Sequence, residues 1–112
     1  MRLQTVVELP EFLRRAKAIM SDAERQALVD YVAANPDAGV SLGGGLRKMR
    51  VARDGSGKRG GYRTIHVFGG RDVPVFLVTV FAKNERDNLS KTEQADLIAL
   101  GKTLLAFYGV RQ

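Results

Sequence analysis

The chain has 112 residues, a net charge of +6 and no cysteine, which excludes disulfides and thiolate chemistry. Its hydrophobic fraction of 45% suits the core of one soluble domain, so we take residues 1–112 as a single domain. No apolar run approaches the roughly 20 residues of a membrane span, and the first residues lack the apolar region of a signal peptide. We therefore expect a cytoplasmic protein without membrane contact. A single histidine excludes a multi-histidine metal cage, and we expect neither metal nor cofactor.

The first residues predict a strand followed by a helix. Residues 2–7 (RLQTVV) are β-prone and predict a short opening strand. Pro10 suits the first turn of a helix, and apolar residues recur at helical spacing through residue 20.

A second helix is predicted to begin at a capping box. The Ser21 side chain can accept from the backbone N–H of Glu24, whose carboxylate reaches back to the serine. Asn35 ends this helix because the following proline disfavours helical geometry in the residue before it. The residues predicted to face inward are Leu28, Tyr31 and Val32. The two helices would form a hairpin.

After Gly43–Gly45, which predicts a loop, the hydrophobic period changes from helical to two. Strands are predicted over 46–53 and 62–68, with a glycine-rich turn at 55–61 between them. Pro74 opens the run VPVFLVTVFA, which predicts a central strand buried on both faces. The short turns favour antiparallel neighbours.

Ser90 and Glu93 form another capping box, which predicts a final helix. Its expected apolar face is Leu97, Ile98, Leu104, Leu105 and Tyr108. The predicted fold class is α+β: an N-terminal strand, a helical hairpin, an antiparallel core sheet of three strands and a C-terminal helix.

The segment from Gly43 to Arg63 holds the whole net charge of the protein. It contains seven basic residues and one acid, whereas the remaining eleven basic and eleven acidic residues cancel. Such a concentrated positive field is typical of a polyanion-binding surface, and a nucleic-acid backbone is the common partner.

Four cations from three adjacent predicted strands are the candidate catalytic residues. Lys48 and Arg50 share one face of the first of these strands, Arg63 belongs to the next, and Lys83 ends the third. Such a cluster can bind a phosphodiester and stabilise the charge that develops during cleavage. RNA supplies its own nucleophile, the 2′-hydroxyl, so no metal is needed. Lys48 is the candidate base, because neighbouring cations favour the neutral form of a lysine.

Two other features have simpler explanations. Residues 55–60 match G-x-G-x-x-G, but a strand follows instead of the helix that a dinucleotide site requires. His66 lies in the middle of a predicted strand, on the face opposite Arg63, and is expected to be a hydrogen-bonded packing residue.

Four stretches together resemble the RelE-type toxins of bacterial toxin–antitoxin modules, and most of all their HigB-like branch. They are GGLRKMRVA (44–52), GKRGGYR (57–63), VFLVTVFAKNE (75–85) and NLS (88–90). The resemblance implies a small α/β fold, ribosome-dependent mRNA cleavage and neutralisation by a cognate antitoxin, which in HigB-like modules is usually a helix-turn-helix (HigA-like) protein. The expected partners are therefore this antitoxin, the ribosomal A site and mRNA.

The family's roles can be transferred to matching positions. Lys48 and Arg50 match the basic pair of the first core strand, Arg63 the phosphate-contacting arginine, and Lys83 the basic residue that closes the last strand. The candidate RNA-binding residues are Arg47, Arg53, Lys58, Arg59, Asn84 and Arg86.

The sequence departs from the family at two points. Asn84 stands where many RelE toxins have arginine, and DNLSKTE (87–93) lacks the aromatic residue that stacks on the substrate base in many of them. Tyr62 does not replace it, since strand alternation points it to the other face.

Two other functions remain as alternatives. A ParE-like toxin shares the fold but inhibits DNA gyrase, and such relatives typically lack the basic cluster. A nucleic-acid-binding module without turnover would interleave aromatic residues with the basic ones, and only Tyr62 does so here.

Overall fold

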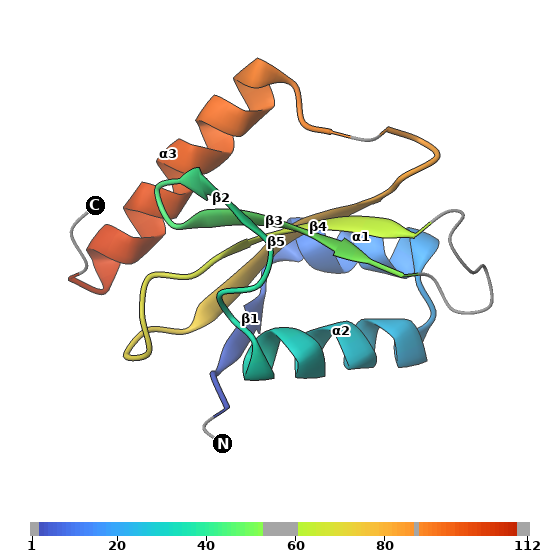
Figure 1. Ribbon diagram of the computed structural model, residues 1–112, viewed down its shortest axis with the longest axis horizontal. Helices are drawn as coiled ribbons and strands as arrows, with labels where there is room; N and C mark the ends of the chain where they lie inside the picture. Colours follow the sequence, from blue (N-terminus) through green and yellow to red (C-terminus); the bar gives the residue numbers. More distant parts are fainter. Residues whose placement is uncertain (1–2, 53–60, 87, 110–112) are drawn as a thin grey trace.

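The described strands form one five-stranded sheet, and the helices pack against it (Figure 1). The computed structural model describes residues 3–52, 61–86 and 88–109. In chain order the elements are β1 (Val6–Glu8), α1 (Pro10–Ile19), α2 (Asp22–Ala34), β2 (Val40–Gly43), β3 (Leu46–Val51), β4 (Tyr62–Val67), β5 (Val75–Ala82) and α3 (Lys91–Phe107). The predicted α+β class is confirmed, with a mostly antiparallel sheet between two N-terminal helices and one C-terminal helix.

The sheet has the strand order β1-β5-β4-β3-β2. The pairs from β5 to β2 are antiparallel as predicted, whereas β1 runs parallel to β5, with Val6 opposite Val75. Every residue of β5 except the last is buried, which explains its continuous apolar run. The opening strand begins at Val6 rather than at residue 2, because Gln4 bonds outside the ladder, donating its backbone N–H to the Ala33 carbonyl.

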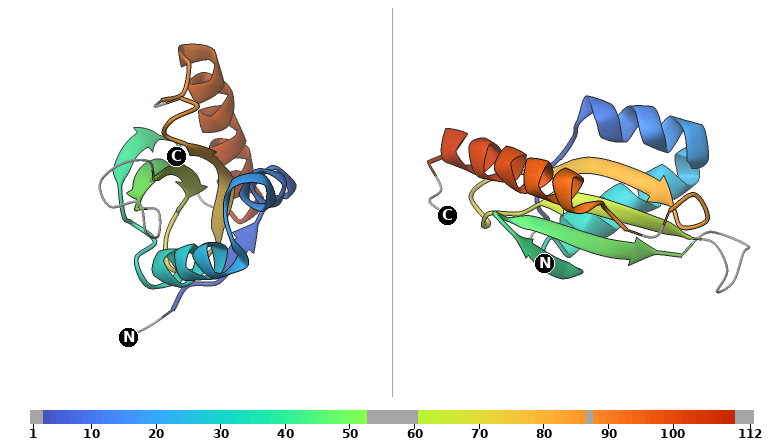
Figure 2. Two further views of the ribbon diagram at one scale, coloured as in Figure 1. Left: turned by 90° about the vertical axis from the view of Figure 1, so that its right-hand side faces the viewer. Right: turned by 90° about the horizontal axis from the view of Figure 1, so that it is seen from above.

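Two apolar clusters cover opposite faces of the sheet, and Figure 2 shows α3 lying apart from the α1–α2 pair. On one face α1 and α2 contribute Phe12, Ala16, Leu28 and Val32, which pack with Met49 and Tyr62 of the sheet. On the other face Leu105 of α3 packs with Leu46, Ile65, Val67, Phe76 and Phe81. Residues that alternate along β3 and β4 therefore face different helices.

Both predicted capping boxes are confirmed. The Ser21 hydroxyl accepts from the Glu24 N–H at 3.0 Å, and the α3 box has the same geometry. Leu28 and Val32 of α2 are buried as predicted, but Tyr31 is 52% exposed, so its predicted inward position is wrong. Successive residues of a helix are about 100° apart, and Tyr31 therefore lies to the side of the face that Val32 buries.

The strand β2 was absent from the prediction. Gly43 ends it, and Gly44 and Gly45 form the turn into β3, all three with positive φ between 63° and 102°. The predicted loop is therefore a tight hairpin turn that needs glycine. Only Leu42 of β2 is partly buried, so this edge strand lacks the apolar alternation by which a strand is recognised.

α3 approaches the β2–β3 turn closely at Gly101. A Cβ on this residue would lie 2.7 Å from the Gly44 carbonyl oxygen, so a side chain here would push the helix away. Leu105 is buried, and Leu97, Ile98 and Leu104 are partly buried against the α3 cluster, as predicted. Tyr108 is 46% exposed and not a core residue, although its ring lies 5.8 Å from that of Phe76. None of the described helices is long and apolar enough to cross a membrane.

Candidate active site

The cations of β3 and β4 lie on the α3 face of the sheet. Arg50 is the cross-strand partner of Arg63, and Lys48, two residues before Arg50, points to the same side. Leu46 and Ile65, which share this alternation, pack into the α3 cluster. Apolar side chains thus cover one part of this face of the sheet. The three cations lie next to that part, further along the same two strands.

A hollow of about 390 Å³ brings Lys48, Arg50 and Arg63 together. We refer to it below as the cationic hollow. Its wall is completed by the side chain of Asn88 and by residues Gly39, Val40 and Met49. Arg63 is only 5% exposed, whereas Arg50 is exposed, so the hollow joins a buried guanidinium to a solvent-accessible one.

Asn88 holds the Lys48 side chain. Nζ of Lys48 donates to Asn88 Oδ1 at 3.0 Å, and the same oxygen accepts from the Leu89 N–H. This bond reaches from β3 to the segment just before α3, forty residues further along the chain. Sequence reasoning missed Asn88 as a site residue; its only signal was its place at the start of the NLS run.

The described lining of the cationic hollow contains three positive groups and no acid. Because charge-assisted hydrogen bonds to an anion are strong, this arrangement suits an anionic ligand, and paired guanidinium groups suit a phosphate. Within residues 3–52, 61–86 and 88–109, no three His, Cys, Asp or Glu side chains gather into a group that could hold a metal ion.

A family model described as the RelE toxin of the RelE/RelB toxin–antitoxin system matches residues 7–110. This range spans all three helices and every residue of the cationic hollow. The chain belongs to the RelE toxin family. Membership implies a cognate antitoxin as partner, and it confirms the resemblance at the level of this family.

Lys83 of this RelE-family toxin lies beside the hollow and not among its lining residues. Its backbone N–H donates to the Gly61 carbonyl at 3.0 Å, and its side chain is exposed. It comes two residues after Phe81, the cross-strand partner of Arg63, so strand alternation directs it to the same side. Three of the four predicted catalytic cations are thus brought together, and the fourth, Lys83, lies outside the lining of the hollow on the same face of the sheet. Asn84 is exposed in the turn that follows.

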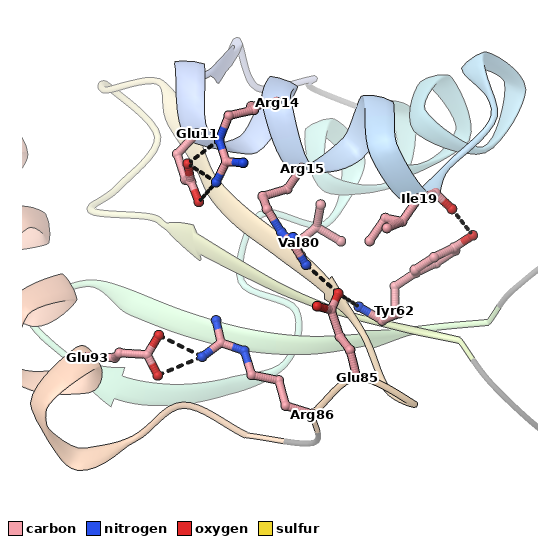
Figure 3. A network of polar contacts seen from close by, with 10 residues as sticks. Glu11, Arg14, Arg15, Ile19, Tyr62, Val80, Glu85, Arg86 and Glu93 are labelled. Carbon is pink, nitrogen blue, oxygen red and sulfur yellow. Dashed lines mark hydrogen bonds and ion pairs between the residues drawn. The ribbon is translucent and has the colours of Figure 1, made fainter.

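The turn after β5 is fixed from two sides, as Figure 3 shows. Arg86 donates to both carboxylate oxygens of Glu93, at 2.7 and 2.6 Å, and its guanidinium lies 4.6 Å from the centre of the Phe81 ring. The bond from Arg86 lowers the pKa of Glu93 to about 2, assisted by the Ser90 N–H. On the other side Glu85 pairs with Arg15 of α1. Arg86 was predicted to contact RNA, but in the folded toxin its guanidinium binds Glu93 and packs on Phe81.

Arg47 points away from the cationic hollow. Its guanidinium donates to the carbonyls of Ala38 and Gly39, at 3.1 and 3.0 Å, and so holds the segment that leads into β2. The other three candidate RNA-binding residues, Arg53, Lys58 and Arg59, lie outside the described residues.

His66 is a packing residue, as predicted. It is fully buried, and its Nε2 donates to the Pro36 carbonyl at 2.8 Å. Burial lowers the pKa of His66, and the nearby positive charge of Arg47 lowers it further. The hydrogen bond to the Pro36 carbonyl raises the pKa, but the net shift is downward. Tyr62 also points away from the cations as expected, since its hydroxyl donates to the Ile19 carbonyl at 2.9 Å (Figure 3).

Proposed function

We propose that this RelE-family toxin is a ribosome-dependent mRNA endonuclease of the HigB-like branch. The observation that carries the proposal is the cationic hollow, in which Lys48, Arg50 and Arg63 converge without an acid among the described lining residues. A ParE-like inhibitor of DNA gyrase has no use for such a phosphate-binding hollow. Action on translating ribosomes would take place in the cytoplasm, and neutralisation would fall to a helix-turn-helix antitoxin.

Arg50 and Arg63 would hold the scissile phosphate of the mRNA. Their positions on adjacent strands allow two guanidinium groups to approach the same phosphate from neighbouring directions. Negative charge builds on the non-bridging oxygens as the pentavalent transition state forms, and fixed cations stabilise this state more than the ground state. Arg63 is buried, and a buried cation at a fixed position needs little reorganisation for this task.

Cleavage would use the 2′-hydroxyl of the RNA as nucleophile. The 2′-oxygen bonds to the neighbouring phosphorus, the bond to the 5′-oxygen breaks, and the products are a 2′,3′-cyclic phosphate and a 5′-hydroxyl that takes up a proton. Lys48 is the proposed acceptor of the 2′-hydroxyl proton, and its bond to Asn88 fixes the nitrogen at the wall of the hollow. Lys83, exposed beside the hollow, would contact the RNA backbone outside the cleavage point.

The test is to produce the protein in bacterial cells and map new 5′ ends of cellular RNA. We expect cuts within translated codons that disappear in Arg50→Ala, a variant chosen because Arg50 is exposed and its loss leaves the core intact. Lys17→Ala, which removes an exposed lysine of α1, is the control that should still cut. Growth arrest with intact mRNA and damaged DNA would refute the nuclease and favour gyrase inhibition.

A further inference from the structure

A second hollow meets the cationic hollow at Arg50. This groove of about 360 Å³ runs between α2 and β3, and Arg50 is one of its lining residues as well as one of those of the cationic hollow. Met49 also belongs to both. The two hollows therefore adjoin across the same stretch of β3, one on each side of the strand. Their combined volume and shared wall suggest that one ligand can occupy both.

The groove differs from the cationic hollow in its chemistry. Six of its ten lining residues are apolar, Met20, Leu28 and Met49 among them, and the walls also include the ring of Tyr31. It also contains a carboxylate, Glu24, which accepts from the Tyr62 hydroxyl at 3.2 Å. An acid repels a phosphate, so the groove suits an uncharged, flat group better than a second phosphate.

Tyr31 is the aromatic residue of this groove that is accessible to a ligand. It is 52% exposed, whereas Tyr62, the other aromatic residue there, is 2% exposed and bonded to the Ile19 carbonyl. A half-exposed tyrosine beside a phosphate-binding cluster has the character of a stacking platform, since bases splayed out of single-stranded RNA stack on aromatic side chains.

We propose that the groove binds a nucleobase of the mRNA adjacent to the phosphate held at Arg50, with Tyr31 as its stacking platform. This inference rests on the proposed function and adds a base-binding subsite to it. A volume of about 360 Å³ is within the range of small-molecule sites, roughly 300–1,000 Å³, and is ample for one base.

The segment before β2 packs on the edge of β3 as far as Met49, where Gly39 lies against it, and Arg50 comes next along the strand. The pairing of β2 with β3 ends at Val40 opposite Lys48, and no described strand pairs with β3 on that side from Met49 onward. The nucleotide that follows a phosphate at Arg50 can therefore turn around this edge and place its base against Tyr31. The exposed side chain of Arg50 remains at the turning point.

The proposal can be tested by binding the toxin to ribosomes programmed with an mRNA whose A-site codon carries 2′-deoxyriboses, which prevents cleavage. We expect Tyr31→Ala to weaken binding about 5- to 150-fold, the range for loss of one base–aromatic stack. Tyr31→Phe keeps the ring and should bind like the wild type. Tyr108→Ala is the matched control, because Tyr108 has similar exposure, at 46%, and lies directly after α3, outside both hollows.

Three further mRNAs, each lacking one base of the A-site codon but retaining all phosphates, identify the stacked base. At one of the three positions, Tyr31→Ala should no longer weaken binding. The base that stacks on Tyr31 is missing from that mRNA, so removal of the ring costs no further affinity. Equal binding of Tyr31→Ala and wild type would overturn the proposal. So would a loss that persists undiminished on all three abasic codons, which would mean that Tyr31 contacts ribosomal RNA, protein or its own fold instead.

A cleavable mRNA, assayed in parallel, separates this inference from the proposed function. Wild-type protein that cuts the mRNA while Tyr31→Ala binds as well as the wild type would refute the base subsite alone. Wild-type protein that binds the ribosome but never cuts would refute the nuclease, and the abasic series would still decide the subsite. Absence of ribosome binding by the wild type would overturn both.

Discussion

The buried imidazole of His66 makes the stability of the fold depend on pH in a defined window. Its Nε2 donates to the Pro36 carbonyl, so in the neutral ring Nδ1 carries no proton, and this atom has no hydrogen-bond partner among the described residues. Protonation would place a new N–H and a positive charge in this buried site, near Arg47. The pKa of His66 is lowered for this reason, with burial as the largest cause.

The unfolded chain therefore takes up a proton at a higher pH than the folded protein. An unfolded histidine has a pKa of about 6.5, so the contribution of His66 is fully present above that pH and is lost as the pH falls below it. Each proton bound only by the unfolded state costs at most about 1.4 kcal/mol per pH unit. Between pH 6.5 and pH 5 the free energy of unfolding should fall by at most about 2 kcal/mol.

The assay is urea unfolding at pH 8, 6.5 and 5, followed by circular dichroism, for the wild type and for His66→Gln. Glutamine keeps an N–H that can reach the Pro36 carbonyl but cannot be protonated, so its stability should be nearly constant across this range. Glu85 and Glu93 have lowered pKa values, and their contributions are lost only below about pH 4.5, outside the window. Wild-type and variant stabilities that change in parallel between pH 8 and pH 5 would refute the reasoning.

Three more predictions concern the site and its support. Lys48→Met should lower the rate of mRNA cleavage on programmed ribosomes by about 100-fold or more, the range for loss of one charge-stabilising or proton-transfer group, and an unchanged rate would exclude Lys48 as the base. Asn88→Ala should lower the rate by less, and the double variant should be no slower than Lys48→Met alone; additive losses would show that Asn88 acts independently of Lys48. Ser90→Ala removes the side-chain cap of α3 and should lower the free energy of unfolding by about 1 kcal/mol in urea titrations without changing the cleavage rate of the folded protein; an unaltered midpoint would mean that the capping bond is not stabilising.

Strong local signals allowed most of the fold to be predicted. Capping boxes at Ser21 and Ser90 fixed two helix starts, and the doubly buried β5 was recognisable because apolar side chains face both layers. β2 escaped prediction since an edge strand without a buried face has no hydrophobic period. The parallel pairing of β1 was also missed, because contacts between residues nearly seventy positions apart leave no trace in local pattern.

Only the part of the site that depends on the alternation of side chains along a strand could be predicted from the sequence. The spacing of Lys48 and Arg50 gave their common face, and the strand pairing then brought Arg63 to them. Asn88 was not recognised as a site residue because its contact with Lys48 comes from a bond across the fold. The engagement of Arg47 and Arg86 with other groups of the toxin was missed for the same reason: net charge along the sequence does not reveal which cations already have partners.

The parallel pair of β1 and β5 has a consequence for synthesis of the toxin on its own ribosome. Val6 can find Val75 only after that part of the chain has left the exit tunnel, and Asn88 emerges later still. Because a sheet that joins distant segments closes late, the nascent chain would lack the complete sheet until β5 has emerged. A product that terminates before Val75 would lack the strand that holds β1 and β4 together, so such an error of translation would yield a fragment that cannot form the sheet.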